Sequence, residues 1–206
     1  MKALVYTEPG RIIFREEPDP APAPGEALIR VEAVGICGSD LHAYLGHDER
    51  RPPPLILGHE VSGRALSGEY EGQRVVLNPL VTCGRCDLCL GGRSNLCSQR
   101  QIIGMPPRQG AYAELVAMPE VNLVPVSGEL DPVKATLAEP VATALHAIAA
   151  AVKALASGAL GPLDWVETRA LSDGAQAFAD LEAGKTAAAK ILLRASEPVG
   201  AAPLCG

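Results

Sequence analysis

The chain has 206 residues, of which 48% are hydrophobic and 20% charged, so it can bury a core and has no need to be disordered. A formal net charge of −6, with no basic stretch, argues against nucleic acid as a partner. The first residues carry no apolar segment typical of a signal peptide, and no apolar run approaches the roughly 20 residues of a membrane span. We therefore expect a cytoplasmic protein without a membrane partner.

Short strands separated by turns are expected over the first 130 residues. In residues 27–34, apolar side chains such as Val31 alternate with the charged Arg30 and Glu32. The other expected strands there are residues 1–6, 11–16, 60–66, 73–81, 111–117 and 121–125. Glycine and proline separate these segments throughout. This punctuation favours a barrel or a sandwich of short antiparallel strands.

One helix is expected over residues 140–156, where the chain becomes rich in alanine. Pro140 suits its first turn and Gly158 its end. Apolar residues recur at steps of three or four and give a single apolar face. They are Val141, Leu145, Ile148, Val152 and Leu155.

The rest of the chain predicts a shorter helix over residues 174–182, with Asp173 available as its N-cap. A closing strand is expected over residues 188–194. Residues 195–206 are expected to form a frayed tail.

Four cysteines lie within fifteen residues, in the spacing C-x2-C-x2-C-x7-C. Four thiolates that close can surround one Zn²⁺ tetrahedrally, and they leave no position open for a substrate. A structural zinc is therefore predicted. Two disulfides, four free thiols or an iron–sulfur cluster are the alternatives, and a chain without export signals disfavours disulfides. The four residues are Cys83, Cys86, Cys89 and Cys97.

A second metal site is suggested by Cys37 and His59, since thiolate and imidazole are both ligands that suit zinc. Taken alone, one cysteine and one histidine are weak evidence, because a lone histidine more often has a structural role.

The motifs GICGSDLH (35–42) and LGHEVSG (57–63), the four-cysteine loop and LAEP (137–140) follow one another in this order. Together they resemble the motif set of the zinc-dependent medium-chain alcohol and polyol dehydrogenases. The resemblance covers residues 1–150, and residues 153–194 are similar to the returning C-terminal segment of the same catalytic domain. It implies a mainly β, α+β fold: a single GroES-like β-barrel catalytic domain over residues 1–194, with both zinc sites in residues 1–150.

The resemblance implies that Cys37 and His59 are ligands of a catalytic zinc. Glu139 falls where the polyol (sorbitol and butanediol) branch has a glutamate ligand, which favours a small alcohol or polyol as substrate. The alternative is that Glu139 is only an acidic residue in the first turn of its helix. His47 and His146 match no metal position, so a surface role and a helix-face role are expected for them.

The resemblance also implies roles for the residues around this zinc. Glu60 would approach the metal as an alternating ligand or bind a partner near it. Asp40 would hydrogen-bond a ring nitrogen of His59 and fix its orientation. Ser39 would contact the substrate hydroxyl, and His42 would pass the proton to solvent.

The Rossmann domain of this family is expected to be missing. It would follow the helix after the glutamate ligand, and it needs G-x-G-x-x-G between a strand and a helix with an acidic residue about 20 positions on. No such motif occurs here. We therefore expect two zinc ions per chain but no tight binding of NAD(P), because nothing would hold its pyrophosphate.

The two halves of the family pattern appear joined near residues 149–152, inside the expected helix. The apolar face of the expected helix continues without a break across this junction, and the residues there are mostly alanine. This pattern predicts an engineered deletion. Autonomous hydride transfer would then be impaired, and the face uncovered by the lost domain would promote self-association. Two other functions stay open: a hydrolytic catalyst that uses zinc as a Lewis acid, and a zinc-stabilised scaffold without enzyme activity.

Overall fold

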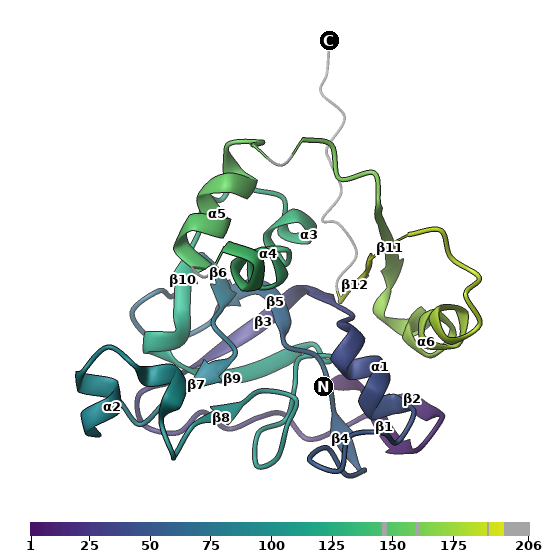
Figure 1. Ribbon diagram of the computed structural model, residues 1–206, viewed down its shortest axis with the longest axis horizontal. Coiled ribbons are helices and arrows are strands. Elements are labelled where there is room, and N and C mark those ends of the chain that lie inside the picture. The colour runs from purple at the N-terminus through teal and green to yellow at the C-terminus, as the bar shows by residue number, and fades with distance from the viewer. Residues whose placement is uncertain (146–147, 160, 189, 196–206) are drawn as a thin grey trace.

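A computed structural model describes residues 1–145, 148–159, 161–188 and 190–195 (Figure 1). Strands dominate the first 130 residues, as their alternation predicts, and the longer helices lie in the second part of the chain. Within the described residues, no helix has both the length and the apolar character that crossing a membrane would require.

A small sheet is formed by the N-terminal hairpin. Strands β1 (Lys2–Glu8) and β2 (Arg11–Glu16) pair antiparallel, and β4 (Leu55–Ile56) joins the other side of β1. Gly10 takes a φ of +76° in the turn between β1 and β2, a backbone conformation that favours glycine.

The large sheet is built around β3 (Glu26–Gly35), whose buried Ala27, Ile29 and Val31 alternate with the exposed Arg30 as expected. Its other strands are β5 (Glu60–Ala65), β6 (Arg74–Leu77), β9 (Leu115–Pro119), β10 (Leu123–Pro125), β11 (Val166–Ala170) and β12 (Lys190–Arg194). Along one side of β3, β9 pairs with its first half and β12 with its end, while β5 pairs along the other side.

The strand order of this sheet is β10-β6-β5-β3-β12-β11, with β9 also on β3. Strands β10 and β11 therefore stand at the two ends, and the described pairings do not close a barrel. The described pairs within the first 130 residues are antiparallel as expected, and the parallel pair of β11 with β12 lies beyond them. Helix α6 (Gly174–Glu182) connects these two strands, as a parallel pair requires a crossover.

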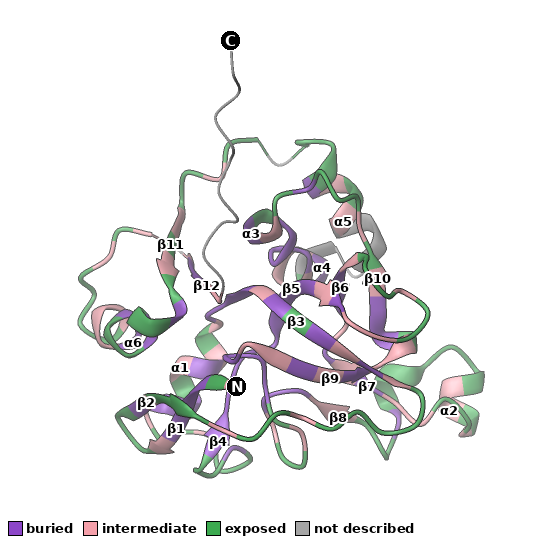
Figure 2. Ribbon diagram, turned by 180° about the vertical axis from the view of Figure 1, so that it is seen from behind, coloured by how far each residue is buried: buried purple, intermediate pink, exposed green. Residues whose placement is uncertain are grey.

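Two apolar clusters fill the interior. One lies between the small sheet, the large sheet and α6, and contains Tyr6, Tyr112 and Phe178. The other lies under the helices α3 (Pro132–Ala135), α4 (Ala138–Leu145) and α5 (Ile148–Ala156), and contains Leu137 and Leu192. Figure 2 shows the buried residues gathered along the strands.

The expected single helix over residues 140–156 is wrong. The structure has two helices, α4 and α5, which pack against each other instead of continuing along one axis (Figure 1). The Thr143 hydroxyl donates to the carbonyl of Glu139, a back-bond that weakens and bends helices. Residues 149–152, where the two halves of the family pattern are expected to join, lie inside α5, so an engineered junction there stays a prediction.

Both expected ends of this helical region are observed. Pro140 lies in the first turn of α4, and Gly158 follows α5 with a φ of +71°. His146 lies outside the described residues, as does the expected tail beyond residue 195. Helix α6 has the expected bounds, although the Asp173 side chain at its N-cap makes no capping hydrogen bond.

Some expected strands are shorter or divided. Residues 73–81 form two strands, β6 and β7 (Leu80–Val81), and residues 111–117 become a strand only from Leu115. The first part of residues 121–125 lies in a 3-10 turn, η2 (Glu120–Asn122). Strand β7 pairs with β8 (Gln101–Ile102), and this small ribbon leads into and out of the four-cysteine loop.

Candidate metal centres

The four-cysteine loop brings its sulfur atoms together in a compact group. The Sγ–Sγ distances are 3.5 Å for Cys86 and Cys89, 3.6 Å for Cys83 and Cys97, 3.9 Å for Cys83 and Cys89, and 4.0 Å for Cys86 and Cys97. Four sulfurs placed tetrahedrally around Zn²⁺ at about 2.3 Å would be separated by about 3.8 Å. A disulfide would need sulfurs about 2.05 Å apart, so all four cysteines are free thiols.

The loop offers little else to hold its shape. Its helices, α2 (Asp87–Leu90) and η1 (Ser94–Leu96), are short and contain no buried residue, and only Cys97 among the cysteines is buried. The backbone N–H groups of Arg85 and Cys86 lower the pKa of Cys83 to about 6. Burial and the Cys86 thiol raise the pKa of Cys89 to about 11. The thiols of Cys83 and Cys89 thus lose their protons at very different pH values. A bound cation would stabilise all four thiolates together.

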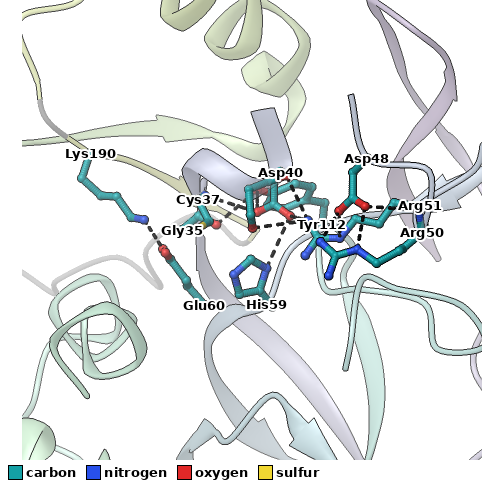
Figure 3. A network of polar contacts seen from close by, with 11 residues as sticks. Gly35, Cys37, Asp40, Asp48, Arg50, Arg51, His59, Glu60, Tyr112 and Lys190 are labelled. Atoms are coloured by element: carbon teal, nitrogen blue, oxygen red, sulfur yellow. Dashed lines mark hydrogen bonds and ion pairs between the residues drawn. The ribbon is translucent and has the colours of Figure 1, made fainter. Parts of the chain in front are cut away.

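The second group consists of Cys37, His59 and Glu60, whose ligand atoms all lie within 4.8 Å of one another (Figure 3). Strand pairing brings them together, because Gly35 at the end of β3 faces Glu60 at the start of β5. Cys37 follows β3 as the N-cap of helix α1 (Gly38–Tyr44). Thiolate, imidazole and carboxylate form a donor set that suits zinc.

Asp40 is the centre of the polar network beside this group (Figure 3). Its side chain is fully buried, and Oδ2 accepts hydrogen bonds from Tyr112 Oη at 2.8 Å and from the backbone N–H of Cys37 at 3.2 Å. The second contact is a capping interaction that helps to start α1 at Gly38. Oδ1 lies 3.4 Å from His59 Nδ1 and 3.3 Å from Arg51 Nη1.

The charges in this network depend on one another. Burial lowers the pKa of His59, but the charges of Asp40 and Cys37 outweigh it and raise that pKa to about 11. Burial raises the pKa of Cys37, but His59 and Ser39 together lower it by more, so its net pKa is below the usual value. The two pKa values thus shift in opposite directions, and a bound cation would compete with the protons of both groups.

A buried polar atom in this group lacks a partner. Oε2 of Glu60 has no hydrogen-bond partner among the described residues, whereas Nδ1 of His59 faces Asp40 Oδ1 at 3.4 Å and leaves Nε2 as the ring nitrogen for a metal. Buried polar atoms in native proteins nearly always have a hydrogen-bond partner. His59 is 7% exposed and Glu60 is 1% exposed, so water does not readily replace a missing partner.

The other expected site residues lie at the edge of this group. Ser39 is half-buried, and its hydroxyl accepts a hydrogen bond of 3.3 Å from Arg51. His42 is exposed in the last turn of α1, and its ring lies 5.8 Å from that of His47. Glu139, at the start of α4, is outside the group of three ligands. Burial raises its pKa, and the nearby charge of His59 lowers it.

Three residues of this network carry no signal in the sequence motifs, namely Arg51, Tyr112 and Lys190. Arg51 and Tyr112 are both buried and both donate to Asp40. Lys190 forms an ion pair with Glu60. None of them belongs to a motif with Cys37 or His59, and the only signal was one lysine directly before three apolar residues of the closing strand.

Comparison with known proteins identifies the family. A family model described as the alcohol dehydrogenase GroES-like domain matches residues 23–128. L-galactonate-5-dehydrogenase of Escherichia coli (strain K12) is 35% identical over an alignment of 152 residues, and the match covers 71% of this chain and 44% of that enzyme. L-threonine 3-dehydrogenase of Xanthomonas oryzae pv. oryzae (strain MAFF 311018) is 39% identical over an alignment of 156 residues, and the match covers 71% of this chain and 46% of that enzyme. The chain thus spans less than half of the length of these relatives.

Solved structures agree with this comparison. A structure described as a zinc-binding dehydrogenase from Sinorhizobium meliloti 1021, bound to NADP, is 37% identical with a TM-score of 0.63, over 70% of this chain and 44% of that chain. AibC is 18% identical with a TM-score of 0.77, over 96% of both chains, and shows a shared fold alone. The expected resemblance to zinc-type dehydrogenases is confirmed at this level, and the chain belongs to the alcohol dehydrogenase GroES-like domain family.

Proposed function

We propose that the chain is the zinc-binding, substrate-binding part of an NAD(P)-dependent alcohol or polyol dehydrogenase. The observation that carries the proposal is the buried group of Cys37 and His59, supported by Asp40, in a chain of the alcohol dehydrogenase GroES-like family. The four-cysteine loop would hold a second, structural zinc. When bound beside Cys37 and His59, a zinc ion would supply Lewis-acid activation of the substrate oxygen.

The residues around the ion would have separate tasks. Cys37, His59 and Glu139 would hold it, and the buried Asp40 would keep the His59 ring in one orientation. Ser39 would contact the substrate hydroxyl next to the ion. Its oxygen accepts a hydrogen bond from Arg51, and its hydrogen would be shared between the Cys37 sulfur and a substrate oxygen.

Proton transfer to solvent is assigned to His42, which is exposed three residues beyond Ser39 on the same helix. Positions i and i+3 share a helix face. A substrate hydroxyl held by Ser39 would therefore have an exposed base on the same side of α1, with water between them.

The hydride acceptor is proposed to be a nicotinamide cofactor held mainly outside this segment. The chain contains no G-x-G-x-x-G turn between a strand and a helix. One related structure contains NADP. We propose weak binding of NAD(P) by this chain alone and slow turnover without a nucleotide-binding partner domain. Self-association through a face left uncovered by such a domain stays a prediction.

The substrate class is proposed from Glu139 and from the relatives. A glutamate at this position favours polyols, and one relative is named for a sugar acid, L-galactonate, and another for L-threonine. All three kinds of substrate carry a secondary hydroxyl flanked by a second polar group. A substrate panel should therefore contain polyols, sugar acids and hydroxy amino acids.

The proposal is tested by incubating the zinc-loaded chain with this panel and with NAD, NADP or a small nicotinamide analogue. We expect slow formation of the reduced nicotinamide, which Cys37→Ser abolishes because the open metal site loses a ligand. His47→Ala is the matched control, since His47 is exposed and has no assigned role.

The proposal would be contradicted if the wild-type chain formed no more reduced nicotinamide than Cys37→Ser with any substrate and acceptor. Hydrolysis of an activated ester that depends on Cys37 would then favour the hydrolytic function. Two bound metal ions without either activity would favour a scaffold.

A further inference from the structure

Lys190 at the start of β12 and Glu60 at the start of β5 form a largely buried ion pair beside the second metal site (Figure 3). Lys190 Nζ donates to Glu60 Oε1, and the two side chains are 11% and 1% exposed. Burying two charges is costly and is offset only when they pair closely. Neither the zinc ligands nor the substrate contacts proposed above give Lys190 a task.

The sheet, and not the local sequence, places Lys190 there. Strand β12 pairs antiparallel with the end of β3, where Leu192 faces Gly35. Beyond this pairing, the N–H of Ile36 donates to the carbonyl of Ile191 at 3.0 Å. Lys190 is therefore fixed next to the Cys37 turn by two backbone contacts of its own strand.

Only one of the two carboxylate oxygens of Glu60 has a partner among the described residues. While Oε1 pairs with Lys190, Oε2 is buried without a hydrogen-bond partner in the part of the chain that the structure describes. Oε2 lies against Gly35, and a Cβ atom at that position would overlap it. The absence of a side chain at Gly35 thus leaves the space in which this carboxylate sits, within 4.8 Å of the Cys37 and His59 ligand atoms.

We propose that Lys190 is a positioning residue that restrains Glu60 and so keeps the open metal position free for substrate. The inference rests on the proposed function, because it requires a metal beside Cys37 and His59. A carboxylate next to a divalent cation is strongly attracted to it. The ammonium group of Lys190 competes for the same carboxylate, and the strand pairing of β12 prevents Lys190 from following Glu60 toward the metal.

The test uses the chain loaded with Co²⁺, whose visible spectrum reports its ligands, and imidazole as a small molecule that binds an open metal position. In Lys190→Met, the freed Glu60 is expected to occupy that position. The affinity for imidazole should then fall by about 10-fold or more, because the freed carboxylate competes with imidazole for the same metal position. The spectrum before imidazole is added should also change.

Three further variants separate this role from a structural one. Lys190→Met combined with Glu60→Gln should regain the wild-type affinity for imidazole, because the competing carboxylate is gone. Lys190→Arg should stay close to wild type, because it keeps the positive charge. Lys185→Met is the matched control, an exposed lysine that precedes the same strand.

An unchanged imidazole affinity in Lys190→Met, or no rescue by Glu60→Gln, overturns the inference and leaves the proposed function standing. A wild-type chain that binds no metal beside Cys37 and His59 overturns the proposed function and the inference with it. Should Lys190→Met fail to fold, a crystal structure of the metal-loaded wild type decides. Glu60 paired with Lys190 and away from the metal supports the inference, and Glu60 bound to the metal overturns it.

Discussion

Replacing Cys97 with alanine is expected to remove one of the two bound metal ions and to unfold residues 83–97 locally. Cys97 is the only buried residue of the four-sulfur group, and α2 has four residues with none buried. Isolated helices of that length are unstable in water. Structural zinc contributes on the order of 10 kcal/mol to small domains of this kind, so its loss cannot be compensated within the loop. Metal content by native mass spectrometry and hydrogen exchange of residues 83–97 measure the two effects.

Cys37→Ala is the matched control for this prediction. It should remove the other metal ion and leave the exchange protection of residues 83–97 intact, because the two groups share no residue. Wild-type protection of the loop in Cys97→Ala would contradict a structural role of the metal there.

Asp40→Ala is expected to lower the free energy of unfolding of the metal-free chain by about 3–5 kcal/mol, the cost of breaking a buried ion pair by removing one partner. Arg51 is 5% exposed and would lose its fully buried partner, keeping only the longer ion pair of 3.6 Å with Asp48. Tyr112 would also lose the acceptor of its 2.8 Å hydrogen bond, and α1 would lose a capping contact. Urea unfolding in the presence of a chelator measures the change.

The pH dependence of this contribution has a definite sign. Burial raises the pKa of Asp40. His59, Tyr112 and Arg51 together lower it by more, so its net pKa lies below the usual 3.8. A lowered pKa in the folded state contributes stability above the unfolded value, and this stability is lost as the pH falls through the folded value. The difference between wild type and Asp40→Ala should therefore be largest near neutral pH and should shrink in acid.

Asp19→Ala is the control for Asp40→Ala, because Asp19 pairs with the N-terminal amino group at 65% exposure. Exposed pairs contribute at most about 1 kcal/mol. Equal effects of Asp19→Ala and Asp40→Ala would contradict the assignment of Asp40 as the centre of a buried network.

The sequence predicted those features that short-range spacing determines. The four-cysteine spacing anticipated a compact sulfur group, and alternation along β3 anticipated which residues are buried. The expected return of residues 188–194 is observed as β12. The prediction of one helix over residues 140–156 was wrong, because the apolar spacing there suits two packed helices as well as one continuous helix.

Arg51 and Lys190 could not be found in this way, because their roles depend on distant contacts. Lys190 reaches Glu60 across 130 positions of sequence, through the pairing of β12 with β3. Arg51 follows another arginine in a proline-rich stretch, and only the fold decides that Arg50 is exposed while Arg51 is buried against Asp40. A charged residue next to a turn gives no signal of the partner that it will meet.

The most direct test of a two-metal dehydrogenase segment is the metal content of the purified chain, together with anomalous scattering at the zinc edge. The account predicts two ions per chain, one among Cys83, Cys86, Cys89 and Cys97 and one bound by Cys37 and His59. A chain with no ion, or with a single ion held only by the four cysteines, would contradict it.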